Sequence, residues 1–161
     1  MDVDLVPVEF DQKPILINLM QKYVHDMSAF TGYDVNDDGL YNLGPHFDLY
    51  WEDPTRHPFF VMHDGALVGF ALVYEDEPSR FTVAEFFILR KYRRAGAGTA
   101  AAELLFQRFK GHWRVAQNEE NTQAQAFWRN VIAQVSGGNF QESWSAQKPR
   151  GPMQTFNNAT D

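Results

Sequence analysis

The segment from residue 81 to residue 110 constrains the fold of this chain more than any other part. Phe81–Leu89 is apolar enough for a buried strand, four of the five residues at 90–94 are cationic, and strong helix formers fill Thr99–Lys110. Gly96 and Gly98 lie in the loop between them. A glycine-rich turn that opens a helix leaves backbone N–H groups without partners, and the helix dipole adds partial positive charge there. This segment therefore predicts a site for a phosphate or pyrophosphate group, which a side chain on either glycine would keep away from the amides.

The remaining sequence predicts short strands and helices around this segment, within a single domain over residues 1–161. The Asp-Gly pair of His63-Asp64-Gly65 indicates a hairpin, and turn-forming residues from Thr31 to Pro45 indicate a long surface loop. We expect further strands at Val3–Glu9, Phe59–Met62, Ala66–Tyr74, His112–Gln117, Asn139–Trp144 and Pro152–Asn157, and helices at 12–29, Phe47–Glu52 and Asn121–Gln134.

Composition excludes several classes of protein. The apolar fraction of 44% is enough for a core, and the absence of cysteine removes disulfides, thiolate metal sites and cysteine nucleophiles. A net charge of −7 argues against broad nucleic-acid binding. No secretory signal or membrane-spanning run is evident, so we expect a cytoplasmic protein with no membrane partner. The histidines show no metal-ligand spacing, and the calcium-loop-like Asp34–Gly39 is followed by Pro45 where a glutamate is required, so we expect no metal.

The glycine loop also matches a second nucleotide-binding motif. Gly96–Ala101 matches G-x-G-x-x-A, and Glu119 follows at a distance that suits a dinucleotide-binding site. However, a cationic segment separates the first glycine from its strand, and too little chain follows for the remaining strand–helix units. A nicotinamide oxidoreductase is therefore a more distant alternative.

Two ordered motifs resemble the GNAT superfamily of N-acetyltransferases. Arg93-Arg94-Ala95-Gly96-Ala97-Gly98 matches the Q/R-x-x-G-x-G/A signature of that family, whose loop binds the pyrophosphate of acetyl-coenzyme A. Asn121-x-x-Ala124-x-x-Phe127-Trp128 is similar to the family segment N-x-x-A-x-x-F-Y. The resemblance implies an α/β (α+β) GNAT-like fold, with a mixed, mostly antiparallel sheet of six to seven strands flanked by about four helices.

The resemblance also implies which residues contact acetyl-coenzyme A, the expected cosubstrate. Phe87 and Ile88 occupy the strand positions whose backbone pairs with the pantetheine arm, and Asn121 matches an asparagine close to that arm. Core burial of the first two and helix capping by Asn121 are alternative roles. The loop residues expected to hold the pyrophosphate are Arg93, Arg94, Ala95, Gly96, Ala97, Gly98 and Thr99.

The expected reaction is direct attack of a primary amine on the acetyl group, without a covalent enzyme intermediate. Glu85 lies where family members often carry an acid, and apolar neighbours would raise its pKa toward that of a general base; orientation toward solvent is the alternative. Trp128 stands at the usual position of a tyrosine, and an indole N–H cannot sensibly give up a proton. Packing, in part against the cofactor arm, is the role expected for Trp128.

The sequence says less about the binding site of the amine acceptor. The resemblance places it beside the first helix and the loop after it, where aromatic and acidic side chains could hold a small-molecule or peptide amine. Packing as a lid on the core is the alternative. The chain would act as a monomer or homodimer, and a catalytically idle acyl-coenzyme A-binding or sensor module of the same fold is the second functional hypothesis. The acceptor-side residues are Phe30, Tyr33, Asp34, Tyr50 and Trp51.

Overall fold

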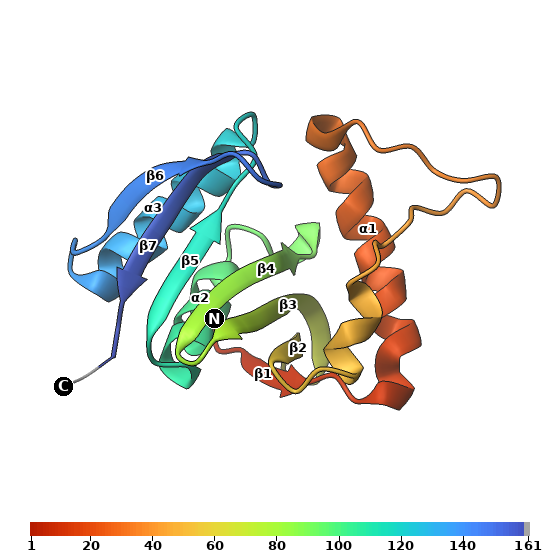
Figure 1. The fold of residues 1–161 in the computed structure, drawn as a ribbon. Coiled ribbons are helices and arrows are strands. Elements are labelled where there is room, and N and C mark those ends of the chain that lie inside the picture. The colour runs from red at the N-terminus through yellow and green to blue at the C-terminus, as the bar shows by residue number, and fades with distance from the viewer. Residues whose placement is uncertain (160–161) are drawn as a thin grey trace.

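The computed structural model describes residues 1–159, which form one central sheet with helices on both faces (Figure 1). The helices are α1 (Lys13–Thr31), α2 (Ala97–Arg108) and α3 (Thr122–Ser136), together with the short 3-10 helices η1 (Phe10–Gln12), η2 (Phe47–Trp51) and η3 (Arg90–Tyr92). The strands are β1 (Asp4–Pro7), β2 (Arg56–His63), β3 (Ala66–Glu77), β4 (Arg80–Ile88), β5 (His112–Ala116), β6 (Gln141–Ser145) and β7 (Gly151–Asn157).

The seven strands lie in the order β1-β2-β3-β4-β5-β7-β6. All neighbours are antiparallel except β4 and β5, which are parallel and joined through α2. The predicted hairpin between β2 and β3 is confirmed, because Asp64 and Gly65 form its two-residue connection with φ values of 49° and 78°. Positive φ at both central residues gives the turn that matches the twist of antiparallel strands.

The two faces of the sheet carry different cores. On one face, α1 and η2 cover an aromatic cluster that includes Phe60, Phe70 and Phe87. On the other face, α2 and α3 cover a cluster that includes Phe106, Trp113 and Ile132. Figure 1 shows α1 apart from the other two helices, with the connecting loop at 32–46 extending outward from its end. The expected long loop is therefore present.

Strands β4 and β5 pair only over three residues before they diverge. The parallel register joins Arg80–Thr82 to residues 112–114, and β5 then continues only beside β7 within the described chain. Toward β3, the register of β4 shifts so that Leu72 opposes Glu85 while Val73 opposes Val83. Ala84 is the extra residue of this β-bulge, and it changes which side chains of β4 face α1.

Most predicted elements are confirmed, with three corrections. The aromatic helix at 47–52 is a 3-10 helix, so the sheet is flanked within residues 1–159 by three α-helices together with 3-10 helices. The strands at Phe59–Met62 and Ala66–Tyr74 are longer than predicted, because their partners continue the hydrogen-bonding ladder. Helix α2 begins at Ala97, two residues before the predicted start, so Gly98 belongs to the helix and not to the loop.

Candidate active site

Glu85 lies in the divergent part of β4, directly after the bulge, on the face covered by α1. The residue is partly buried and keeps some solvent contact. Burial raises the pKa of Glu85 from 4.5 to about 7, and a hydrogen bond from the Tyr23 hydroxyl opposes this shift. At neutral pH the group is therefore divided between an acid and a base, which suits proton transfer.

Tyr23 of α1 is a neighbour of Glu85, and nothing in the local sequence indicates this contact. Its ring packs edge-on to Phe70 and Phe87, with centroid distances of 5.6 and 5.8 Å. Burial and the nearby Glu85 raise the pKa of Tyr23 well above its ordinary value. The phenol therefore stays protonated and can donate to the carboxylate.

Arg56 and Tyr74 extend this cluster, and both were missed in the sequence. The Arg56 guanidinium carbon lies 5.4 Å from the ring centre of Tyr50 and 5.0 Å from that of Tyr74. Arg114 on β5 donates to the Thr82 hydroxyl from Nη2 at 3.1 Å and also pairs loosely with Asp76 at 3.7 Å. These groups come from β2, β3 and β5 and meet through strand pairing, so no local spacing signals them.

The loop after β4 leads directly into the start of α2, where the sequence predicts an anion site. Arg94 and Gly96 have φ values of 63° and 87°, and Gly96 precedes the first residue of α2. The first helical hydrogen bond runs from the N–H of Ala100 to the Gly96 carbonyl. The N–H groups of residues 97–99 therefore precede the helical ladder, and no side chain of residues 1–159 caps this end.

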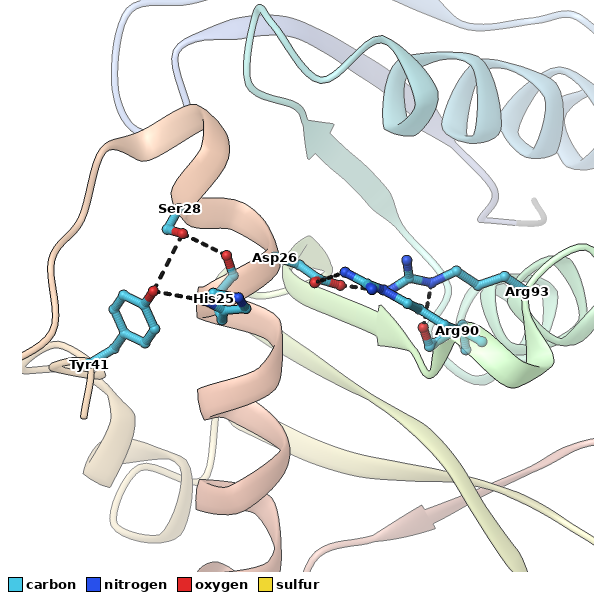
Figure 2. A network of polar contacts seen from close by, with 7 residues as sticks. His25, Asp26, Ser28, Tyr41, Arg90 and Arg93 are labelled. Carbon is cyan, nitrogen blue, oxygen red and sulfur yellow. Dashed lines mark hydrogen bonds and ion pairs between the residues drawn. The ribbon is translucent and has the colours of Figure 1, made fainter. Parts of the chain in front are cut away.

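Two of the four cations at 90–94 are turned away from this helix end. Nη2 of Arg90 and Nη2 of Arg93 each lie 2.9 Å from one carboxylate oxygen of Asp26 on α1 (Figure 2). Nε of Arg93 also donates to the Ile88 carbonyl at 2.8 Å, and its guanidinium lies over the Phe87 ring. Lys91 lies against the Tyr92 ring, so Arg94 is the exposed cation without such a contact among those described.

Glycine is favoured at positions 96 and 98 for different structural reasons. A Cβ on Gly96 would meet only the N-terminal nitrogen of Met1 at 3.7 Å, so its left-handed backbone is what favours glycine there. A Cβ on Gly98 would lie 3.2 and 3.3 Å from ring carbons of Phe127. A larger residue at position 98 would therefore press on Phe127, so the contact between α2 and α3 is a further structural reason for glycine here.

The side chains of the other predicted loop and strand residues lie partly in the core and partly at the surface. Ala97 is fully buried, whereas Ala95 is exposed and Thr99 is partly exposed. The side chain of Phe87 faces the α1 side and that of Ile88 faces the α2 side. For Ala97, Phe87 and Ile88, only backbone groups are therefore placed to meet a ligand at the divergence of β4 and β5.

At the start of α3, Asn121 acts as the helix cap. Its Oδ1 accepts a hydrogen bond from the N–H of Ala124 at 3.1 Å, and its Nδ2 lies 3.8 Å from the sulfur of Met27 on α1. Trp128 is 5% exposed and packs edge-on against Phe86, with 4.9 Å between ring centres. Trp128 therefore belongs to the core beneath β4.

The five acceptor-side residues do not form one cluster. Tyr50 is buried near Glu85, whereas Trp51 donates from its indole to the Val8 carbonyl at 3.0 Å, near the start of α1. Tyr33 is exposed, and its hydroxyl accepts a hydrogen bond at 3.2 Å from Nζ of Lys148 in the β6–β7 loop. Phe30 lies partly buried in the last turn of α1, and Asp34 is exposed in the loop that follows.

Neither a metal cluster nor a membrane-spanning helix occurs in the described part of the chain. Residues 1–159 contain no group of three or more His, Cys, Asp or Glu side chains that could hold a metal ion. Within the same range, every helix is too short or too polar to cross a membrane.

Comparisons with known proteins agree with the fold described above. Residues 20–131 match the model of the acetyltransferase (GNAT) family. A search of curated proteins gave no match. Among solved structures, an acetyltransferase from Thermus thermophilus is similar at 17% identity and a TM-score of 0.68, covering 98% of this chain and 97% of that one.

Two further structures share the fold. The ribosomal-protein-S18-alanine N-acetyltransferase of Escherichia coli is 12% identical with a TM-score of 0.67, covering 99% of this chain and 96% of that one. The aminoglycoside acetyltransferase AAC(6')-Ib, solved in complex with coenzyme A, is 15% identical with a TM-score of 0.64, covering 97% and 95%. With its fold, its motifs and the family match over most of its length, this chain belongs to the acetyltransferase (GNAT) family.

Proposed function

We propose that this protein is an acetyl-coenzyme A-dependent N-acetyltransferase that acts on a primary amine of a small molecule or peptide. The observation that carries the proposal is the divergence of β4 from β5, with Glu85 on the divergent part of β4 and an uncapped helix start directly after the strand. A basic group and an anion-binding helix end are thereby joined by one short segment of chain.

The residues present fit acetyl-coenzyme A. The N–H groups at the start of α2 and the exposed Arg94 suit a pyrophosphate, and the space around Gly96 leaves the backbone accessible. The β4 backbone at Phe87 and Ile88 would meet the pantetheine arm, because β5 no longer pairs with β4 there. When bound, this cosubstrate supplies an acetyl thioester. The similar fold of AAC(6')-Ib, whose structure contains coenzyme A, supports the fit.

The chain's own contribution to the chemistry centres on Glu85. An alkylamine with a pKa near 10.4 is almost wholly protonated at neutral pH, so it must lose a proton before its nitrogen can attack. The Glu85 carboxylate accepts that proton, directly or through one water molecule. The nitrogen then forms a bond to the acetyl carbon, the C–S bond breaks, and the sulfur leaves with the bonding electrons as a thiolate. The second proton that the nitrogen must lose passes to this sulfur or to water, which leaves a neutral amide and the free thiol. Its ordinary pKa near 8.5 allows this departure without an acid from the enzyme.

Trp128 takes no part in proton transfer in this proposal. Its ring is enclosed by Phe86, Phe106 and Phe127 on the α2 and α3 side of β4, whereas Glu85 faces α1. An indole would in any case be unable to act as an acid near neutral pH. The tyrosine of related enzymes is therefore replaced here by a core residue.

The experiment that tests the proposal begins with cofactor binding. Isothermal titration should show that acetyl-coenzyme A binds the protein and that Gly96→Asp weakens binding by at least about tenfold, because an added carboxylate repels the pyrophosphate. Gly96→Asn is the matched control, since asparagine tolerates the same left-handed backbone and is uncharged. Failure of the wild type to bind, or equal loss in both variants, would contradict the proposed cofactor site.

Turnover is measured on the same proteins by release of free thiol with a panel of amines. Release that depends on an amine and is lost in Glu85→Gln supports the enzyme. Binding of acetyl-coenzyme A without turnover on any amine would instead support the catalytically idle module.

A further inference from the structure

Asp26 joins α1 to the loop after β4 through both of its carboxylate oxygens. Oδ1 pairs with Arg90 and Oδ2 with Arg93, each at 2.9 Å, although 64 or more residues separate the partners (Figure 2). The Asp26 side chain is only 14% exposed, whereas those of Arg90 and Arg93 are 77% and 42% exposed. Burial acts to raise the pKa of Asp26, but hydrogen bonds from Arg93 and Arg90 outweigh it, and the pKa lies below its ordinary value.

The contact continues from the loop to β4. Nε of Arg93 donates to the Ile88 carbonyl at 2.8 Å, and its guanidinium carbon lies 5.5 Å from the centre of the Phe87 ring. Arg93 is therefore held at three points: by α1, by the end of β4 and by an aromatic face. Its Nε and Nη2 are thereby engaged by protein acceptors.

One face of α1 lies against three parts of the proposed site. Tyr23, Asp26 and Met27 stand at positions i, i+3 and i+4, which share a face of a helix. Tyr23 lies beside Glu85, Asp26 bonds the cationic loop, and Met27 contacts Asn121 at the cap of α3. On the other side of α1, Tyr41 bonds His25 at 2.9 Å and thereby secures the loop that follows the helix (Figure 2).

An anion at Asp26 is unfavourable for binding a polyanion nearby. It neutralises two cations that would otherwise attract the pyrophosphate, and its own charge opposes that of the ligand. This cost to binding indicates that the contact serves another step of the reaction.

We propose that Asp26 is a positioning residue for acetyl transfer: by pairing with Arg90 and Arg93 it fixes α1 against the cofactor loop, and so holds Tyr23 and Glu85 in register with the bound thioester. The inference rests on the proposed function, since it assigns a role within that reaction. Asp26 touches neither substrate and acts through the two arginines and through Tyr23.

The test separates the rate of transfer from the binding of the cofactor. In Asp26→Asn, kcat with a saturating amine should fall about ten- to a hundredfold, because small displacements of reacting groups are costly. The Kd for acetyl-coenzyme A should tighten about twofold or more, because an anion is lost and two arginines are released. A loss of folding alone would produce no such tightening.

Two variants complete the design. Asp26→Glu keeps the charge and should return the Kd to the wild-type value while restoring part of kcat. Asp48→Asn is the control, because it removes an ion pair with a more exposed carboxylate between α1 and η2, Lys13 to Asp48 at 2.6 Å, at the opposite end of the helix. Its kcat and Kd should equal those of the wild type.

The inference is overturned if Asp26→Asn keeps the wild-type kcat, or if its Kd for acetyl-coenzyme A weakens. The second result would make Asp26 an organiser of the pyrophosphate loop rather than of the transfer step. Neither outcome affects the proposed function, which fails only if the wild type itself neither binds acetyl-coenzyme A nor acetylates an amine.

Discussion

Glu85 is the residue on which the proposed chemistry depends. Its raised pKa favours activity but lowers the stability of the folded protein at neutral pH. The bulge at Ala84 turns its carboxyl toward α1, where burial raises its pKa to about 7. The sequence located this acid on a strand among apolar neighbours. It could not show which face the acid occupies, because a one-residue bulge reverses the alternation of side chains.

The first prediction concerns Glu85→Gln, which keeps the shape of the side chain and removes its base. We expect kcat/KM for the amine to fall about 10²- to 10⁴-fold, as for loss of a general base. In the wild type, kcat/KM should rise through pH 7 as Glu85 loses its proton, and this limb should be absent from the variant. A pH profile of thiol release measures both effects, and an unchanged limb in Glu85→Gln would assign the base to another group.

The same substitution should have the opposite effect on stability. Glu85 holds its proton more tightly in the folded state than in the unfolded state, so the protein loses stability as pH rises from about 4.5 to about 7. Above that range the cost is at most about 3 kcal/mol. Glu85→Gln should therefore raise the free energy of unfolding at pH 8 by about 1–3 kcal/mol, with the gain vanishing near pH 4. Urea unfolding at several pH values measures the gain, and destabilisation at pH 8 would contradict this prediction.

Among the elements, α2 shows how local and long-range requirements combine at one helix end. Sequence reasoning placed Gly98 in the loop because glycine is a poor helix former. The structure places it in the first turn, where its missing side chain admits the Phe127 ring of α3. Helix propensity acts locally and could not reveal a contact made with a residue of another helix.

The second prediction tests this contact by Gly98→Val. A Cβ at 3.2 Å from the Phe127 ring, with two further methyl groups, should overpack the interface between α2 and α3 and lower the free energy of unfolding by about 1–3 kcal/mol. Thr99→Val, a nearly isosteric change one residue later, is the control and should change stability much less. Thermal unfolding compares the two variants. Equal melting temperatures would show that the interface accommodates the larger side chain without loss of stability.

At the scale of the whole molecule, two sets of strands are joined by a short junction. Strands β1 to β4 form an antiparallel meander, and β5, β7 and β6 form a second group that meets β4 over only three residue pairs. The core beneath α2 and α3 nevertheless crosses this junction, since Val83 of β4 and Trp113 of β5 belong to one cluster. We therefore propose that residues 1–161 act as a single domain.

The third prediction follows from that shared core. Thermal unfolding should give one transition, with the same midpoint by far-ultraviolet circular dichroism and by tryptophan fluorescence, because Trp51 lies in the first group of elements and Trp113 and Trp128 lie in the second. Acetyl-coenzyme A should move the single midpoint upward. Two separate transitions would show that the groups unfold independently.

The sequence by itself determined the features that depend on neighbouring residues. Alternation and apolar runs specified most strands, the Asp64-Gly65 pair specified a hairpin, and Asn121 marked the start of α3. The glycine loop with its cations predicted an anion site, and its two motifs indicated the family.

Only the tertiary structure decided how those parts meet. It turned Arg90 and Arg93 toward Asp26, placed Tyr23 on Glu85 and buried Trp128 beneath β4. The physical reason is one of range: turns, caps and periodicity are set by contacts within a few residues. The charge left for a ligand and the pKa of Glu85 depend on side chains that the folded chain brings together from distant positions.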